Sequence, residues 1–191
     1  MAKSALLLLD IQNGIIDRLP GAGPYLYRLA STVQKARDAS IQIIHVTTAF
    51  RQRYTDLHPR NRSAARVAGS NTYIEGSDSV QIHPAITTTS SDIHVTKKRV
   101  SAFVGSDLDL VLRSLGTESL IIAGVITSGA VLSTVRQAAD LDYQLTVLED
   151  LCMDRDEEVH RILVEKVFHH QAAVVGSEEW LGSLTDVKGD N

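Results

Sequence analysis

Short apolar runs alternate with longer segments of helical periodicity along this 191-residue chain. Residues 5–9 are entirely apolar, and residues 25–39 then place leucine, valine and alanine three or four positions apart. An apolar run without polar alternation is typical of a strand that is buried on both faces. Because strands that alternate with helices form parallel sheets covered on both sides, the pattern limits the fold to the α/β class.

We expect six strands, and right-handed crossovers between them favour a doubly wound, three-layer α/β/α sandwich with a mostly parallel sheet. No linker or internal repeat divides the sequence, so residues 1–191 are expected to form one domain with its core at about 4–181. Strands are expected at 4–10, 41–46, 93–96, 119–125, 144–148 and 172–175. Helices are expected at 25–39, 106–115, 128–141 and 156–169, with short helical turns near 63–68 and 177–181.

Composition restricts the cellular role and the partners of the chain. The formal net charge of −4 gives no reason to expect nucleic-acid binding. The apolar run near the N-terminus is five residues long, too short for a secretory signal, and no run approaches the roughly 18 residues of a membrane span. We therefore expect a cytoplasmic protein that acts on a small molecule, with unconventional secretion left open as an alternative.

Polar side chains at the ends of the expected strands are the candidates for chemistry, because open parallel sheets bind ligands at the carboxyl ends of their strands. Asp10 ends the first strand and Lys97 the third, so the two can form a charge pair that moves protons. Residues 124–130 lead from a strand into a helix, where free backbone N–H groups can hold a developing negative charge. Each feature alone also has a structural explanation, such as a helix cap or a solvated basic loop at residues 97–99.

The residues that carry these features also resemble a known family. Residues 7–12 are similar to the "D-x-Q" strand end of the isochorismatase-like hydrolases, which include many cysteine hydrolases. Residues 95–108 resemble their "T-K-x-x-x-S-A-F-x-G-T-D-L" segment, and residues 120–140 their "G-V-x-T-x-x-C-V-x-x-T-x-x-D-A" segment. Residues 147–154 resemble the later "V-x-x-D-A-x" strand end, and the resemblance as a whole covers about residues 4–181.

The resemblance implies a site with three positions: Asp10 as the family aspartate, Lys97 as the family lysine, and Ala130 in the slot of the nucleophilic cysteine. It also implies a cis peptide bond at Val125–Ile126, next to an oxyanion hole. No cofactor is implied, and the assembly is expected to be a homodimer or homotetramer. Substrate contacts are expected from Gln12, Phe50, Phe103, Ile126, Thr127 and Gly129.

Ala130 decides which reactions remain open, because a methyl group can neither attack carbon nor release a proton. Cys152, the only cysteine, lies beyond the next strand and is interpreted as a packing residue. One hypothesis, implied by the resemblance to the true isochorismatases that also lack the cysteine, is a hydrolase that uses the Asp10–Lys97 pair alone. It would cleave isochorismate, a vinyl ether, to pyruvate and a dihydroxy-cyclohexadiene carboxylate. A second is a cysteine amidase inactivated by a Cys-to-Ala substitution at position 130. A third is a catalytically silent binding protein or scaffold.

The segment 49–92 is the least regular part of the sequence, and long irregular segments in compact domains are often functional. Asp56 and His58 form only a fragment of a metal-binding pattern, so we expect no metal there. Four arginines of this segment have two readings, contacts to a carboxylated substrate or a solvated basic loop. They are Arg51, Arg53, Arg60 and Arg62.

Overall fold

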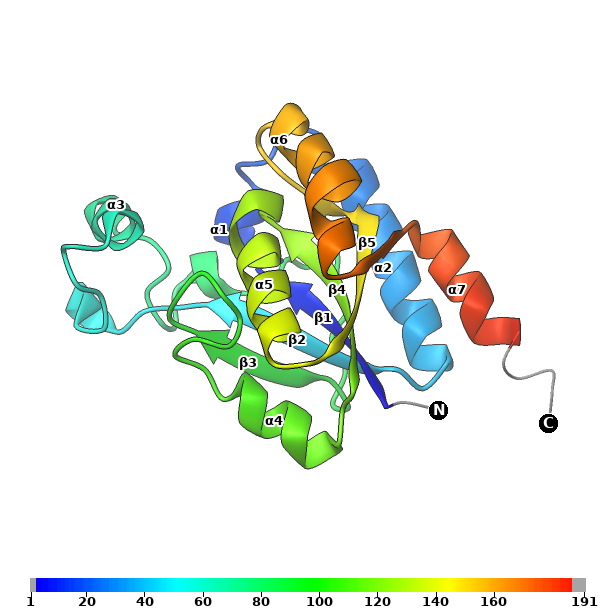
Figure 1. Ribbon diagram of the computed structural model, residues 1–191. Coiled ribbons are helices and arrows are strands. Elements are labelled where there is room, and N and C mark those ends of the chain that lie inside the picture. The colour runs from blue at the N-terminus through cyan, green and yellow to red at the C-terminus, as the bar shows by residue number, and fades with distance from the viewer. Residues whose placement is uncertain (1–2, 187–191) are drawn as a thin grey trace.

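The computed structural model describes residues 3–186 and contains one six-stranded sheet, which Figure 1 shows between layers of helices. The strand order is β3-β2-β1-β4-β5-β6, and every pairing is parallel. This confirms the doubly wound α/β sandwich. Residues 1–2 and 187–191 of the expected single domain lie outside the described part. The strands are β1 (Ser4–Leu9), β2 (Gln42–Thr48), β3 (Ile93–Lys97), β4 (Ser119–Val125), β5 (Gln144–Met153) and β6 (Ala173–Val175).

Helices cover both faces of the sheet and enclose two apolar cores (Figure 1). Side chains of α2 and α7 pack in one core, and those of α4, α5 and the segment after α6 in the other. No helix within residues 3–186 is both long and apolar enough to cross a bilayer. The helices are α1 (Asn13–Ile16), α2 (Ala22–Asp38), α3 (Arg62–Ser70), α4 (Leu108–Leu115), α5 (Leu132–Asp140), α6 (Glu157–Ile162) and α7 (Ser177–Asp186).

The unbroken apolar sequence of β1 follows from its central place in the sheet. Leu7 and Leu9 belong to one core, whereas Leu6 and Leu8 belong to the other. Successive side chains of a strand point to opposite faces, so a strand with a core on each side needs apolar residues at every position. The strand ends at Leu9, so Asp10 follows directly at the carboxyl edge of the sheet.

Several elements differ in extent from the expectation. The expected helix 106–115 begins at Leu108, and 128–141 divides into a π-helical turn, Thr127–Val131, followed by α5. The expected strand 144–148 continues to Met153, because a register shift between Ile122 and Gly124 lets β5 keep pairing with β4. The four-residue helix α1 was not expected, since its sequence contains glycine and is too short to show a periodicity.

At Gly124, β4 passes very close to Leu9 of β1. The φ of Gly124 is 142°, and a Cβ atom placed there would lie 2.4 Å from the carbonyl oxygen of Leu9. Both the backbone conformation and the close approach exclude any residue with a side chain. The glycine therefore allows β4 to run against β1 up to the start of the turn that carries Ala130.

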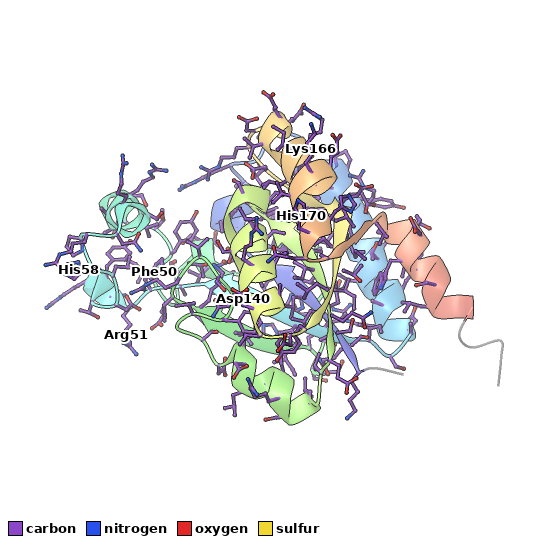
Figure 2. All side chains as sticks on the ribbon, viewed as in Figure 1. Phe50, Arg51, His58, Asp140, Lys166 and His170 are labelled. Carbon is purple, nitrogen blue, oxygen red and sulfur yellow. The ribbon has the colours of Figure 1, made fainter. Side chains whose placement is uncertain are left out.

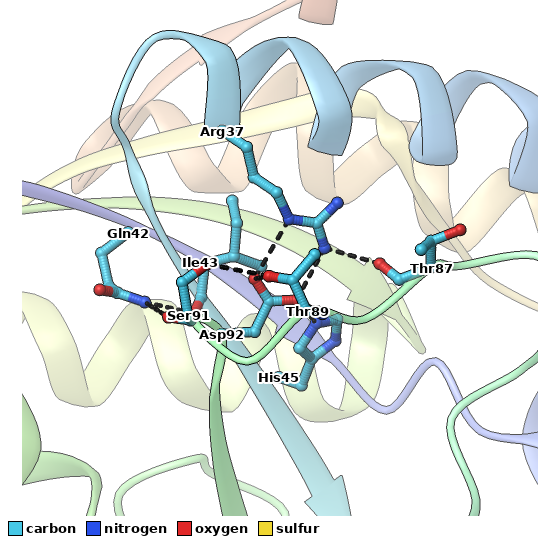
Figure 3. A network of polar contacts seen from close by, with 8 residues as sticks. All are labelled: Arg37, Gln42, Ile43, His45, Thr87, Thr89, Ser91 and Asp92. Carbon is cyan, nitrogen blue, oxygen red and sulfur yellow. Dashed lines mark hydrogen bonds and ion pairs between the residues drawn. The ribbon is translucent and has the colours of Figure 1, made fainter.

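A buried polar network ties the β2–β3 edge of the sheet to α2 (Figure 3). Arg37 donates hydrogen bonds to both carboxylate oxygens of Asp92, at 3.1 and 2.7 Å. Nε2 of His45 lies 3.0 Å from Oδ2 of the same carboxylate, and the backbone N–H of Thr89 donates to it as well. Because each buried charge has a partner, the network holds the approach to β3 in one conformation.

Candidate active site

Asp10 and Lys97 meet at the carboxyl edge of the sheet, although 87 positions separate them in the chain. Nζ of Lys97 lies 3.0 Å from Oδ2 of Asp10. Lys97 is 2% exposed and Asp10 is 6% exposed. β2 lies between β1 and β3, so the lysine side chain extends over the end of β2 to reach the aspartate. The structure thus forms a buried charge pair of the kind that the sequence predicts.

Thr48, the last residue of β2, connects the two members of the pair. Its hydroxyl donates to Oδ1 of Asp10 at 2.9 Å and accepts a hydrogen bond from Nζ of Lys97 at 2.6 Å. Nζ also donates to the carbonyl oxygen of Arg99 at 3.0 Å. All three donors of the ammonium group therefore have an acceptor, which fixes its position. Thr48 was not among the site residues predicted from the sequence, where the second strand was expected to end at residue 46.

Gln12 is fully buried and holds the strand ends in register rather than pointing into open space. Its Oε1 accepts the backbone N–H of Thr48 at 2.7 Å, and its Nε2 donates to the carbonyl oxygens of Thr48 and Val80, each at 3.0 Å. The amide therefore fixes the backbone of Thr48 while the threonine hydroxyl connects the ion pair. The contact of Gln12 with a substrate stays a prediction.

The turn after β4 carries the rest of the predicted site. Its peptide bond Val125–Ile126 is cis, as the resemblance implies. The side chain of Ala130 is 4% exposed and belongs to the same core cluster as Leu9 and Val95. Leu9 precedes Asp10, and Val95 lies two residues before Lys97 on the same face of β3. Ala130 therefore lies at the carboxyl ends of adjacent strands, on the face of the sheet that carries Lys97.

Two side chains that sequence reasoning missed hold this turn in place. Nδ1 of His160 lies 2.9 Å from the hydroxyl oxygen of the fully buried Thr127. Oδ2 of Asp154 accepts the backbone N–H of Ser128 at 2.7 Å. Burial lowers the pKa of His160, against the opposing effect of Asp154 and Glu149, so the imidazole is neutral at pH 7. Both residues lie between β5 and the end of α6, and no pattern in the sequence connects them to residues 127–128.

The remaining predicted contacts lie in different surroundings. Ile126 packs against the core under α2, and Gly129 is half-buried in the turn. Phe50 is buried just after β2, with its ring centroid 6.2 Å from that of Tyr54. Phe103 instead stacks on Tyr143, with ring centroids 6.1 Å apart, and Tyr143 precedes the amino end of β5. That position places the Phe103 ring away from the strand ends that carry Asp10, so its substrate contact stays a prediction.

Lys98 and Arg99, which follow Lys97, form ion pairs or hydrogen bonds within the protein, unlike the basic residues of a solvated loop. Lys98 pairs with Glu75 and lies 3.6 Å from Oδ2 of Asp56, and its Nζ donates to the carbonyl oxygen of Ala49 at 2.7 Å. Arg99 donates to the carbonyl oxygen of Asp56 at 3.0 Å. The carboxylate of Asp56 also accepts the backbone N–H of Arg51 at 3.1 Å. Within residues 3–186, no three His, Cys, Asp or Glu side chains gather as a metal site requires.

Cys152 has the character of a packing residue. It is buried in the core between the sheet and α5, and burial raises the pKa of its thiol to about 12. A thiol in that state supplies almost no thiolate at neutral pH, so Cys152 is chemically inert in the folded chain. It therefore does not supply the thiol nucleophile that the resemblance implies for position 130.

A cavity of about 520 Å³ opens beside β2 and β3, but it belongs to a different face of the sheet. Thr47, His94 and Thr96 line it. These residues alternate along their strands with Thr48 and Lys97, and alternate side chains of a strand point to opposite faces. The strand residues that line the cavity therefore face away from Thr48 and Lys97, although Val80, which also lines it, accepts a hydrogen bond from Gln12.

The chain is similar to known proteins over almost its full length. The sequence profile of the Isochorismatase domain matches residues 4–179. The isochorismatase family protein YwoC of Bacillus subtilis is 30% identical, with 94% of this chain and 93% of YwoC aligned. The ureidoacrylate amidohydrolase RutB of Methylobacterium radiotolerans is 28% identical over 97% of this chain and 77% of its own length.

Solved structures show the same fold. A cysteine hydrolase from Pseudomonas syringae pv. phaseolicola superposes with a TM-score of 0.90 at 20% identity, covering 96% of this chain and 93% of that one. The shared architecture includes the parallel sheet and the helices on both its sides. The match of the domain profile over residues 4–179 and the 30% identity to YwoC show that the chain belongs to the isochorismatase family of hydrolases.

Proposed function

We propose that this protein is a hydrolase that works by proton transfer through Asp10 and Lys97, without a covalent intermediate, and that its substrate is isochorismate or a similar vinyl ether. The observation that carries the proposal is the buried pair itself, with Nζ of Lys97 3.0 Å from Oδ2 of Asp10 and an alanine in the nucleophile slot. Asp10 and Lys97 can transfer protons, whereas the alanine side chain cannot form a thiolate.

The pair can deliver a proton in two short transfers. The ammonium of Lys97 passes a proton across the 3.0 Å hydrogen bond to the carboxylate of Asp10, which leaves a neutral amine and a carboxylic acid. A dry site favours this neutral form over the charged one more than water does. The carboxylic acid then protonates the methylene carbon of the enol ether and becomes a carboxylate again.

Water completes the reaction. The protonated substrate is an oxocarbenium ion, and a water molecule adds to its charged carbon and gives up a proton to the carboxylate–amine pair. The resulting hemiketal loses its alcohol group, and pyruvate and a dihydroxy-cyclohexadiene carboxylate are released. Ala130 fits this chemistry, because it leaves no thiol to compete with water for the cation.

The decisive experiment measures pyruvate release from isochorismate, with chorismate and a simple enolpyruvyl ether as further substrates. We expect turnover by the wild-type chain and a loss of about 10²- to 10⁴-fold in both Asp10→Asn and Lys97→Ala, the usual contribution of a positioned acid–base group. Lys35→Ala, which removes an exposed lysine of α2, is the matched control and should keep full activity. No pyruvate from any substrate, or full activity in either site variant, would reject the proposal.

The similarity to a ureidoacrylate amidohydrolase favours a second candidate, an amidase whose nucleophile has been replaced by Ala130. In that case Ala130→Cys restores a thiol that gives its proton to Asp10 and attacks an amide carbon. The variant should then hydrolyse ureidoacrylate, simple amides or N-carbamoyl amines, while the wild-type chain does not. An inactive Ala130→Cys chain that folds normally would exclude this candidate, and inactivity in both experiments would leave the binding-protein hypothesis.

A further inference from the structure

The cavity of about 520 Å³ beside β2 and β3 has the size of a small-molecule site, and no step of the proposed reaction uses it. β3 is the outermost strand on its side of the sheet. His94 and Thr96 of this strand line the cavity and are exposed. A dissolved molecule can therefore enter the cavity from the β3 edge.

Two hydroxyl groups stand side by side on the sheet wall of this cavity. Thr47 of β2 and Thr96 of β3 are register partners, so their side chains share one face of neighbouring strands about 4.8 Å apart. The hydroxyl of Thr96 has no hydrogen-bond partner within residues 3–186, and that of Thr47 reaches only the carbonyl oxygen of Val95, at 3.5 Å. Each hydroxyl can still donate and accept a hydrogen bond.

The ring of His94 is held in place before any ligand arrives. It stacks on the ring of His45, with centroids 5.1 Å apart. His45 is in turn fixed by its 3.0 Å contact with Asp92, in the buried network of Figure 3. A side chain that is already ordered loses little freedom on binding, so this wall of the cavity is preorganised.

The second wall begins where the chain returns to the end of β2. The backbone N–H of Phe50, labelled in Figure 2, donates to the carbonyl oxygen of Tyr73 at 2.7 Å. The N–H of Glu75 then donates to the carbonyl oxygen of Phe50 at 2.8 Å. These two bonds fix Glu75, which lines the cavity, beside the end of the strand that carries Thr47.

The second wall is largely apolar and close to neutral. Glu75 is the only acidic residue among the described residues that line the cavity, and no lysine or arginine is among them. Lys98 pairs with Glu75 from outside the cavity and also donates to the carbonyl oxygen of Ala49, at 2.7 Å. A neutral ligand with one apolar face therefore fits better than an ion. The apolar side chains of this wall are Val80, Ile82, Pro84 and Ile86.

We propose that this cavity is a second ligand site, for a neutral molecule whose ring carries hydroxyl groups on neighbouring carbons, as nucleosides and free sugars do. One hydroxyl of such a diol can meet Thr47 and the other Thr96, while the less polar face of the ring packs against the apolar wall. Glu75 adds a carboxylate, an acceptor that proteins often use for ribose hydroxyls. Binding here does not depend on which reaction Asp10 and Lys97 catalyse.

The second wall is bonded to the chain that follows Asp10, so an occupant can act on the candidate active site. Residues 80–83 pair with residues 11–13 across three hydrogen bonds, and the side chain of Gln12 also holds the backbone of Thr48. A ligand that ties residues 80–83 to the sheet therefore also steadies this strand end. The bonds run from Asn13 to Gln81 at 3.0 Å, from His83 to Ile11 at 2.9 Å and from Gln12 to Val80 at 3.0 Å.

The first experiment titrates the full chain with adenosine and with ribose by isothermal titration calorimetry. We expect at least one of them to bind with a dissociation constant of about 1 mM or below. Their 2′-deoxy and 2-deoxy counterparts lack one hydroxyl of the diol and should bind about 10-fold more weakly. Much tighter binding of adenosine identifies a nucleoside as the ligand, and equal binding of ribose identifies a free sugar.

Variants locate the bound molecule. Thr47→Val and Thr96→Val each remove one hydroxyl, keep the branched shape, and should weaken binding about 5- to 10-fold. Thr96→Ser keeps the hydroxyl and should bind as the wild type does. Thr87→Val changes an exposed threonine of the same segment that does not line the cavity, and it is the matched control. Circular dichroism establishes that every variant is folded.

The link to the active site is measured by hydrogen exchange. With the probe at saturation, the backbone amides of Asn13 and His83 should exchange at least about 3-fold more slowly, because both donate across the bonded segments. Exchange at an unchanged rate would overturn the link. No binding of either diol at about 10 mM, equal binding of the deoxy compounds, or full binding by both valine variants at positions 47 and 96 would overturn the site itself.

Discussion

Nδ1 of His160 lies 2.9 Å from Oγ1 of Thr127, so a helix after β5 is attached to the turn after β4. Thr127→Val removes the hydroxyl, keeps the volume, and leaves the half-buried imidazole without this partner. We expect the free energy of unfolding to fall by about 1–3 kcal/mol, measured by urea denaturation. Thr127→Ser retains the hydroxyl and should lose much less. Equal losses in both variants would mean that the methyl group, rather than the hydrogen bond, stabilises the turn.

Thr48 should affect turnover more than stability, because its hydroxyl contacts both members of the ion pair. Thr48→Val leaves Lys97 with one unused donor and Asp10 with one fewer hydrogen bond. A hydrogen bond to a charged group is worth about 1.5–3 kcal/mol, so kcat/KM should fall about 10- to 100-fold. Thr48→Ser keeps the hydroxyl and should remain within a few-fold of wild type. The rates are measured on the substrate that the Asp10 and Lys97 experiments identify, and an unchanged rate in Thr48→Val would show that the bridge has no role.

Gly124→Ala should be among the most destabilising single-methyl changes in the chain. The added Cβ would meet the carbonyl oxygen of Leu9 at 2.4 Å, at a φ of 142° that alanine rarely adopts. We expect a loss of more than about 3 kcal/mol, measured as a fall in Tm or as failure to accumulate folded protein. Gly23→Ala, inside α2 with no atom within 4 Å of the new Cβ, is the matched control and should be neutral or stabilising by up to about 1 kcal/mol. Similar behaviour of the two variants would contradict the close approach of β4 to β1.

His45 should make the stability of the protein depend on pH. Burial lowers the pKa of its imidazole more than the contact with Asp92 raises it, while the nearby His94 and Arg37 lower it further. A histidine with a lowered pKa contributes its full stability above the unfolded value of about 6.5 and loses it as the pH falls toward the folded value. Between pH 7.5 and 5.5 the wild-type free energy of unfolding should therefore fall by about 1 kcal/mol more than that of His45→Gln.

The pH experiment compares slopes, which removes the unequal stability of the two chains at neutral pH. His160 also has a pKa lowered by burial, but it titrates in both chains and cancels in the comparison. Glutamine can still donate a hydrogen bond to Asp92, so the Arg37 pair keeps its partner. Parallel slopes for the two chains would show that His45 titrates normally despite its burial.

The parts of the fold that could be read from the sequence are those with a local signal. The apolar run 5–9 predicts a central strand, because only a strand with a core on each face needs apolar residues at every position. Asp10 and Lys97 could be placed together, because parallel strands end at the same edge of a sheet. The π-helical turn 127–131 could not be separated from α5, since both segments keep a helical spacing of apolar residues.

The parts that could not be read depend on contacts between distant segments. Lys98 is the same residue type as its neighbour Lys97 and lies in the same part of the sequence, yet it forms an ion pair with Glu75 and not with Asp10. Asp154 and His160 reach the turn after β4 only because β5 continues past its expected end. Phe103 matches a family motif, but its stacking on Tyr143 depends on how the loop after β3 folds back.

The backbone hydrogen bond from Phe50 to Tyr73 closes a loop, residues 51–72, whose two ends lie side by side. This hydrogen bond fixes the separation of the two loop ends, whatever residues lie between them. The free energy of closing a loop changes only slowly with its length. Relatives can therefore diverge here in length and charge, and acquire different assemblies, while the strands that hold Asp10 and Lys97 stay the same. Assembly and chemistry can then evolve at separate rates in one small protein.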